Sequence, residues 1–245
     1  MKKFIFCICF VTSFLFLSAQ DIPEALKNDF SIEKANLATA VKNQGQTGTC
    51  WSFSTTSLLE SQLLKNNNSN INLSEMFTVR NIYLDKATNY VMRQGAAQFG
   101  EGGLGHNVIE AIAKYGSMPE EAYSGLLPTQ QEYNHSKLMN ELKIYLDSLL
   151  KHKPLMPHWQ KGVAQILDKY MGAAPDKFNF EGKEYTAKNF AVEVLKFNAS
   201  DYVNLTSFTH KPFYEPFIID IPDNFSNGSY YNIPMEELIK VTKAA

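Results

Sequence analysis

Apolar side chains recur at helical spacing along most of the chain. The apolar face of the segment 51–65 is formed by Phe53, Leu58, Leu59, Leu63 and Leu64. Glu60 and Gln62 fall among its polar positions. Similar patterns predict helices at residues 74–92, 107–115, 132–152, 159–171 and 186–197, and a last helix from Pro234 to the end of the chain.

The predicted helix ends carry residues that favour caps. Ser74 is a good N-cap, and Glu75 adds a negative charge in the first turn of the same helix. Thr186 is expected to cap a later helix in the same way. Gly116 and Gly172 each follow a predicted helix, where glycine commonly ends the helical conformation.

Strands are fewer and gather towards the C-terminus. Residues 41–45 read as a strand that runs into a turn, and residues 178–185 as a short hairpin. Residues 202–206 and 217–221 are also strand-like. The pattern predicts an α+β fold, and 245 residues suit one sizeable domain or two small ones.

The first twenty residues differ from the rest. Lys2 and Lys3 precede an apolar run at residues 4–17, and short side chains follow at residues 18–20. This pattern predicts a secretory signal peptide at residues 1–20, with the mature chain at 21–245 and a periplasmic or secreted location. A retained membrane anchor is the alternative, although the run is short for a membrane span.

Charge and cysteine content narrow the function classes. The chain has 23 Lys and Arg against 25 Asp and Glu, without a basic stripe, which disfavours nucleic-acid binding. Of three cysteines, Cys7 and Cys9 lie in the predicted signal peptide. The mature chain then keeps Cys50 alone, which excludes an intrachain disulfide and a zinc ligand set and predicts no metal or cofactor. Cys50 is either an inert buried thiol or a reactive one.

The residues around Cys50 favour a reactive thiol. A cysteine in the first turn of a helix meets the positive end of the helix dipole and unpaired N–H groups, which stabilise a thiolate. Gly45 and Gly48 allow a tight loop before it. That loop brings the Gln44 amide towards the Cys50 N–H, and two such donors can bind the oxyanion of a tetrahedral intermediate.

The segment NQGQTGTCWSFS, residues 43–54, resembles the active-site segment of papain-like cysteine peptidases. Thr47 stands where papain and cathepsins have a disulfide cysteine, as in the bleomycin hydrolase and aminopeptidase C branch. Residues 72–75 and the Glu101-Gly102-Gly103 segment are also similar to the family. The resemblance implies a papain-like fold with mainly the helical (left) domain, a helical insertion at about residues 130–200, and the start of the β-rich domain.

The same resemblance implies a function and site residues. It implies a hydrolase of peptide substrates with Cys50 and Gln44 as catalytic residues and Gly102, Gly103 and Trp51 as substrate-binding residues. Gly102 and Gly103 have a simpler alternative as loop residues. Relatives of this branch form hexamers, so a homo-oligomer is an expectation.

A catalytic histidine is missing from its expected place. Papain-like enzymes carry it about 130–150 residues after the cysteine, and residues 180–200 contain none. His106 is interpreted as a surface or supporting residue, His135 and His152 as solvated, and His158 as part of a helix start. His210 is the one remaining candidate for this histidine. It is a weak one, because Lys211-Pro212 interrupts the strand that should follow it.

The resemblance implies that the helical insertion moves the histidine and asparagine downstream, so we expect partners beyond Ala245 and a truncated chain. Three hypotheses stay open: an aminopeptidase of bleomycin hydrolase type, an endopeptidase, and a catalytically incomplete fragment or non-catalytic peptide-binding homologue.

Overall fold

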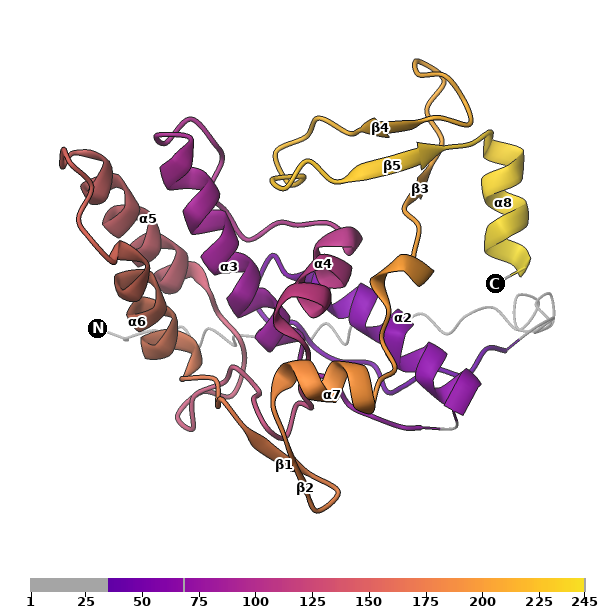
Figure 1. Ribbon diagram of the computed structural model, residues 1–245, viewed down its shortest axis with the longest axis horizontal. Coiled ribbons are helices and arrows are strands. Elements are labelled where there is room, and N and C mark those ends of the chain that lie inside the picture. The colour runs from indigo at the N-terminus through magenta and orange to yellow at the C-terminus, as the bar shows by residue number, and fades with distance from the viewer. Residues whose placement is uncertain (1–34, 68, 245) are drawn as a thin grey trace, which may run out of the picture. The chain divides into compact units, whose positions relative to one another are not determined.

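The computed structural model describes residues 35–67 and 69–244 (Figure 1). Leu37–Ala245 form one compact unit, to which all the elements below belong. The predicted signal peptide at residues 1–20 lies outside the described residues. In the described part of the chain, no helix is both long and apolar enough to span a membrane.

The central helix of the unit is α3 (Glu75–Met92), which packs against α2 (Cys50–Asn67), α4 (Gly105–Tyr115), α5 (Ser136–Leu150) and α6 (Trp159–Met171) (Figure 1). Because neighbours surround it, most of its residues are buried, among them Met76, Val79 and Tyr83. Its predicted cap is confirmed: the Ser74 Oγ accepts a hydrogen bond from the Phe77 N–H at 3.0 Å.

The helices α5 and α6 pack on each other and on α3. The buried stripe of α5 has the spacing of one helix face and consists of Leu138, Leu142, Leu146 and Leu149. The helix predicted from residue 132 begins only at Ser136. The reason is that Asn134 pairs with Gln46 in an isolated bridge, and its Oδ1 accepts the Ser136 N–H at 3.1 Å.

The predicted hairpin is confirmed as β1 (Phe178–Phe180) and β2 (Lys183–Tyr185), which pair antiparallel. Glu181 and Gly182 both have positive φ, the conformation that a two-residue turn of this kind requires. Thr186 caps α7 (Ala187–Glu193), which ends before the predicted residue 197. Lys196 adopts a left-handed conformation there, and this turns the chain away from the helix axis.

The C-terminal part forms a three-stranded sheet in the order β3-β5-β4, preceded by the short 3-10 helix η1 (Ala199–Asp201). Its strands are β3 (Leu205–Thr206), β4 (Pro216–Ile218) and β5 (Ser229–Asn232), and α8 (Met235–Ala244) follows. β3 is parallel to β5, and β4 is antiparallel to it. The pattern of the sequence did not predict β5.

The strand predicted at residues 41–45 is wrong. These residues belong to no strand, because no segment among the described residues pairs with them, and the nearest pairing is the single Gln46–Asn134 bridge. The α+β class predicted from the sequence is confirmed, with helices dominant and small sheets between and after them.

Candidate active site

Cys50 is the first residue of α2, and its thiol is free and exposed. The carbonyl of the preceding residue, Thr49, accepts the N–H groups of Ser52 at 2.9 Å and Phe53 at 3.3 Å. The N–H groups of Cys50 and Trp51 open the helix, where no intrahelical acceptor is available to them. The sulfur therefore lies at the positive end of α2, as the sequence predicted.

Gln44 is fixed within the loop that precedes Cys50. Its Nε2 donates to the Thr47 carbonyl at 2.6 Å, and the Thr47 hydroxyl donates back to the Gln44 carbonyl at 2.8 Å. Gly45 turns the chain between them with φ = 60°. The second N–H of the Gln44 amide makes no hydrogen bond within the described residues, so it remains a donor for a bound oxyanion.

The chain just before α5 holds the same loop from one side. The Gln46 N–H donates to the Tyr133 carbonyl at 2.8 Å. A Cβ at Gly45 would come within 2.5 Å of that carbonyl oxygen, so only glycine permits this approach. The Gln46 side chain also bonds Glu132 and Asn134, at 2.8 and 3.0 Å.

The glycine segment holds the loop from another side. The Glu101 carboxylate accepts the Gly48 N–H at 2.6 Å. The backbone carbonyl of Glu101 accepts the Trp51 Nε1–H at 3.0 Å. A Cβ at Gly103 would lie 2.8 Å from the Trp51 ring. Trp51 is only 5% exposed, so it supports Gly103 from beneath and offers little surface to a substrate.

Gly102 lies against a residue from the C-terminal part. The Asp223 carboxylate occupies the space that a Cβ at Gly102 would need. Lys86 donates to the carbonyls of Gly100 and Gly102. Burial lowers the pKa of Lys86 to about 8, although the carboxylates of Asp223 and Glu101 oppose that shift. The glycine segment is thus fixed in place and partly covered.

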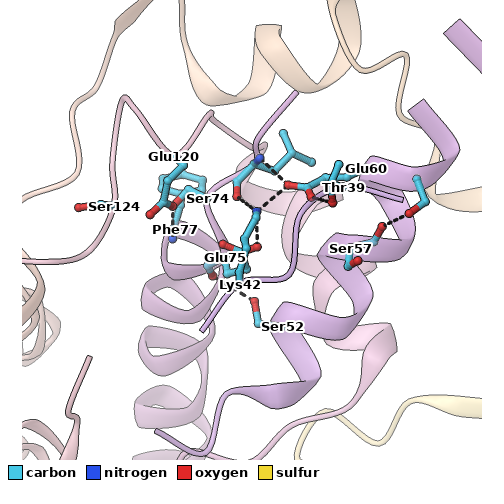
Figure 2. Close-up of polar contacts among 12 residues, drawn as sticks. Thr39, Lys42, Ser52, Ser57, Glu60, Ser74, Glu75, Phe77, Glu120 and Ser124 are labelled. Atoms are coloured by element: carbon cyan, nitrogen blue, oxygen red, sulfur yellow. Dashed lines mark hydrogen bonds and ion pairs between the residues drawn. The ribbon is translucent and has the colours of Figure 1, made fainter. Parts of the chain in front are cut away.

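A buried ion cluster (Figure 2) consists of Lys42, Glu60 and Glu75. The Lys42 Nζ is 2.7 Å from a Glu60 oxygen and 2.6 Å from a Glu75 oxygen, and it also donates to the Leu73 carbonyl at 3.2 Å. Thr39 donates to the other Glu60 oxygen at 2.6 Å. Glu60 is 0% exposed, so its interpretation as a polar helix position was incomplete: it faces Lys42 and not solvent.

Electrostatics within the cluster follow from burial and pairing. Burial lowers the pKa of Lys42, but its hydrogen bonds to Glu60 and Glu75 outweigh burial and raise that pKa above its ordinary value. Burial raises the pKa of Glu75 despite the bond to Lys42. The Glu75 carbonyl accepts the Ser52 hydroxyl at 3.0 Å, which joins the cluster to the first turn of α2.

Glu120 adds a further carboxylate beside the cluster (Figure 2). One of its oxygens lies 3.1 Å from the Tyr133 hydroxyl, and the other is buried without a hydrogen-bond partner in the described residues. Burial, reinforced by the negative charge of Glu75, raises the pKa of Glu120 to about 7. No sequence pattern predicted this group, because its neighbours come from distant segments.

Burial bears on two histidine interpretations. Of the two given for His106, the surface residue is wrong and the supporting residue stays a prediction: the ring is 3% exposed, and Tyr230 and Ser226 lie 2.9 and 3.0 Å from its nitrogens. His135 was expected to be solvated, but it is 3% exposed, and its Nδ1 is 3.0 Å from the Tyr83 hydroxyl. Burial lowers the pKa of His135 to about 4. Neither position has a sequence signal, because both rings are buried by distant residues.

The other three histidines lie close to where the sequence put them. His158 occupies the N-cap position of α6, and His152 is exposed just after α5. His210 is exposed in a turn, with its ring against Phe208 and Phe217. Within residues 35–67 and 69–244, no group of three or more His, Cys, Asp or Glu side chains is arranged to hold a metal ion.

Sequence comparisons relate this loop and its surroundings to known proteins. The family described as "Papain family cysteine protease" matches residues 26–145. The viral cathepsin of Autographa californica nuclear polyhedrosis virus is 37% identical over 94 residues, which cover 38% of this chain and 25% of that protein. Cysteine proteinase 1 of Dictyostelium discoideum is 35% identical over 103 residues, which cover 41% and 29%. The chain thus spans about a quarter of the length of these curated relatives.

A structural comparison extends the likeness beyond the matched segment. The crystal structure of PepW from Lactobacillus rhamnosis HN001 superposes with a TM-score of 0.66 at 19% identity, over 90% of this chain and 59% of that one. At this identity the likeness shows a shared fold, and it reaches the helices and sheets that follow residue 145. With the match at residues 26–145, it confirms the predicted papain-like fold, and residues 26–145 carry the similarity to the papain family of cysteine proteases.

Proposed function

We propose that the protein hydrolyses peptide bonds with Cys50 as the nucleophile. The observation that carries this proposal is the position of Cys50, a free, exposed thiol at the first residue of α2. The Cys50 sulfur attacks the carbonyl carbon of the substrate, and the amine leaves with a proton. Water then hydrolyses the resulting thioester and releases the acid.

The loop supplies the donors that such a reaction needs. The Cys50 N–H and the second N–H of Gln44 stabilise the oxyanion of the tetrahedral intermediate. Proton transfer also requires a base. We assign no base to His106 or His135, because each ring is buried against a tyrosine hydroxyl.

We propose further that the enzyme is an aminopeptidase. Support comes from Thr47, which stands where papain and cathepsins have a disulfide cysteine, and from the helices α5, α6 and α7, which fall in the segment that resembles the bleomycin hydrolase insertion. An endopeptidase is the alternative. Export after cleavage near residue 20 is also proposed, from the apolar run at residues 4–17, and the mass of the mature chain tests it.

Active-site labelling tests the nucleophile. The full chain and its Cys50→Ser variant are treated with a peptidyl epoxide, and the adduct is mapped by mass spectrometry. We expect one adduct at Cys50 and none there in the variant. Labelling confined to Cys7 or Cys9, or peptide hydrolysis that survives Cys50→Ser, would refute the proposal.

Substrate blocking tests the specificity. A fluorogenic aminoacyl amide with a free amino group should be hydrolysed, while the same compound with an acetylated amino group should not. Equal turnover of both compounds would make the enzyme an endopeptidase.

A second candidate is a peptide-binding protein without catalysis. The buried, tyrosine-bonded rings of His106 and His135 and the cover of Asp223 over Gly102 favour it. Calorimetry would then detect peptide binding by the full chain with no hydrolysis product and no difference between wild type and Cys50→Ser.

A further inference from the structure

The loop that carries Gln44 and Cys50 is held without a covalent tether. Cys50 is the one cysteine in the part of the chain that the structure describes, and its thiol is free. Among the described residues, the hydroxyl of Thr47 bonds within the loop, to the Gln44 carbonyl and to Thr49. The position of the loop relative to the glycine segment therefore depends on hydrogen bonds that cross between them.

Glu101 makes the crossing bonds. Its carboxylate accepts the Gly48 N–H at 2.6 Å, from a residue 53 positions away in the sequence and two residues before Cys50. Its backbone carbonyl accepts the Trp51 indole N–H at 3.0 Å, one residue after Cys50. The two segments are also in van der Waals contact, because a Cβ at Gly48 would lie 3.0 Å from the Glu101 Cβ. Glu101 thus hydrogen-bonds the chain both before and after Cys50, at Gly48 and Trp51.

Glu101 is itself held in place. Lys86 donates to the carbonyls of Gly100 and Gly102, the two neighbours of Glu101. A carboxylate that accepts a backbone N–H forms a charge-assisted bond, about twice as strong as a neutral one. The bond between Gly48 and Glu101 is therefore short and charge-assisted, and Lys86 holds the backbone on both sides of Glu101.

We propose that Glu101 is a positioning residue for the active-site loop: its carboxylate fixes Gly48, and thereby sets the Gln44 and Cys50 donors against the glycine segment where an extended substrate lies. The effect of Glu101 on catalysis rests on the proposed peptidase function. Its hydrogen bond to the loop does not depend on that function. Glu101 acts through the loop and needs no contact with substrate.

The alternative is that Glu101 acts through its negative charge near the sulfur. Three variants separate the two roles. Glu101→Gln keeps the acceptor and removes the charge, Glu101→Asp keeps the charge and shortens the reach by one methylene group, and Glu101→Ala removes both. Positioning predicts that Gln resembles wild type and Asp resembles Ala, while a charge effect predicts the reverse.

The chain offers a matched control at Glu132. Its carboxylate also bonds the same loop, at 2.8 Å from the Gln46 side-chain nitrogen, but this bond involves no backbone donor. Because it holds a side chain and not the backbone of the loop, Glu132→Ala should change little.

The first measurement is hydrogen exchange in the full chain, read in peptides that contain Gly48. We expect at least about tenfold faster exchange at the Gly48 amide in Glu101→Ala and Glu101→Asp, the loss expected for one charge-assisted bond. Glu101→Gln and Glu132→Ala should stay within about threefold of wild type. Unchanged exchange in both Ala and Asp variants would overturn the inference, whatever the protein catalyses.

The second measurement compares two thiol reagents at Cys50, with adducts mapped by mass spectrometry. The rate with a peptidyl epoxide, which must lie in the cleft, should fall at least about tenfold in the Ala and Asp variants and be retained in Gln. Iodoacetamide needs only an exposed thiol, so its rate should stay within about threefold in every variant. Equal loss with both reagents in Gln and Ala would mean a charge effect and refute positioning.

These outcomes separate the inference from the proposed function. If the peptidyl epoxide fails to label wild type at Cys50, the proposed function fails, and hydrogen exchange alone decides whether Glu101 fixes the loop. If wild type is labelled and Glu101→Ala is labelled as fast, the proposed function stands and the positioning role is refuted.

Discussion

Glu120→Gln should stabilise the protein at pH 8 but not at pH 5. Glu120 has a pKa of about 7 in the folded chain, against an ordinary value of 4.5, because burial and the charge of Glu75 disfavour its ionised form. Between these values the folded chain binds a proton that the unfolded chain releases. The stability that protonated Glu120 contributes is full below about pH 4.5 and is lost as the pH rises through about 7.

The hydrogen bonds agree with a neutral Glu120. The Tyr133 hydroxyl lies 3.1 Å from Glu120 and 3.0 Å from the Ser124 carbonyl, but it has only one hydrogen to donate. A protonated Glu120 donates to the Tyr133 oxygen, which leaves the tyrosine hydrogen for Ser124. A glutamine amide can donate in the same way at every pH.

The ionised Glu120 lowers the free energy of unfolding at high pH. The difference between its pKa of 4.5 in the unfolded chain and about 7 in the folded chain limits this loss to roughly 3 kcal/mol. Glu120 is half-buried, and solvent screening lowers the expected effect to about 1–2 kcal/mol. The free energy of unfolding of Glu120→Gln, minus that of wild type, should therefore rise by about 1–2 kcal/mol between pH 5 and pH 8.

Urea unfolding at both pH values, followed by tryptophan fluorescence, measures this difference. Glu121→Gln is the matched control, since Glu121 is adjacent but exposed, and its difference from wild type should not change with pH. If Glu120→Gln keeps the same difference at pH 5 and pH 8, Glu120 does not bind its proton in the folded chain as argued.

Three further predictions concern stability and titration. Lys42→Met should lower the free energy of unfolding by about 3 kcal/mol in urea, because it leaves the carboxylates of the buried ion cluster without a cation. Gly103→Ala should cost about 1–3 kcal/mol in the same assay, because the new Cβ meets the buried Trp51 ring, whereas Gly100→Ala, with no atom nearer than 3.9 Å, should cost far less. The imidazole of His135 should titrate by NMR with a midpoint near 4, and a midpoint above 6 would contradict its burial.

The loop that carries Gln44 and Cys50 has a local sequence pattern, but distant contacts fix its arrangement. Gly45, Gly48 and Cys50 can be recognised from their spacing alone. Their arrangement is fixed by Tyr133 on one side and Glu101 on the other, which come from separate parts of the chain.

The sequence by itself determined the elements whose causes are local. Ser74 caps α3 through a donor three residues away, and Glu181-Gly182 makes a turn that only positive φ allows. The position of Cys50 at a helix start follows from the same kind of short-range physics. Such features depend on neighbours in the sequence, so they can be predicted from the amino-acid sequence alone.

Only the tertiary structure decided the partners of the polar side chains. Glu60 looked like a solvent-facing helix position, but it is buried against Lys42 from 18 residues earlier. His135 looked exposed, and His106 was open between the surface and a supporting role, but both are buried against residues 52 and 124 positions away, respectively. Burial is a property of the packed chain, and a buried polar group gains its stability from whichever distant partner satisfies it. Spacing along the sequence carries no record of that partner.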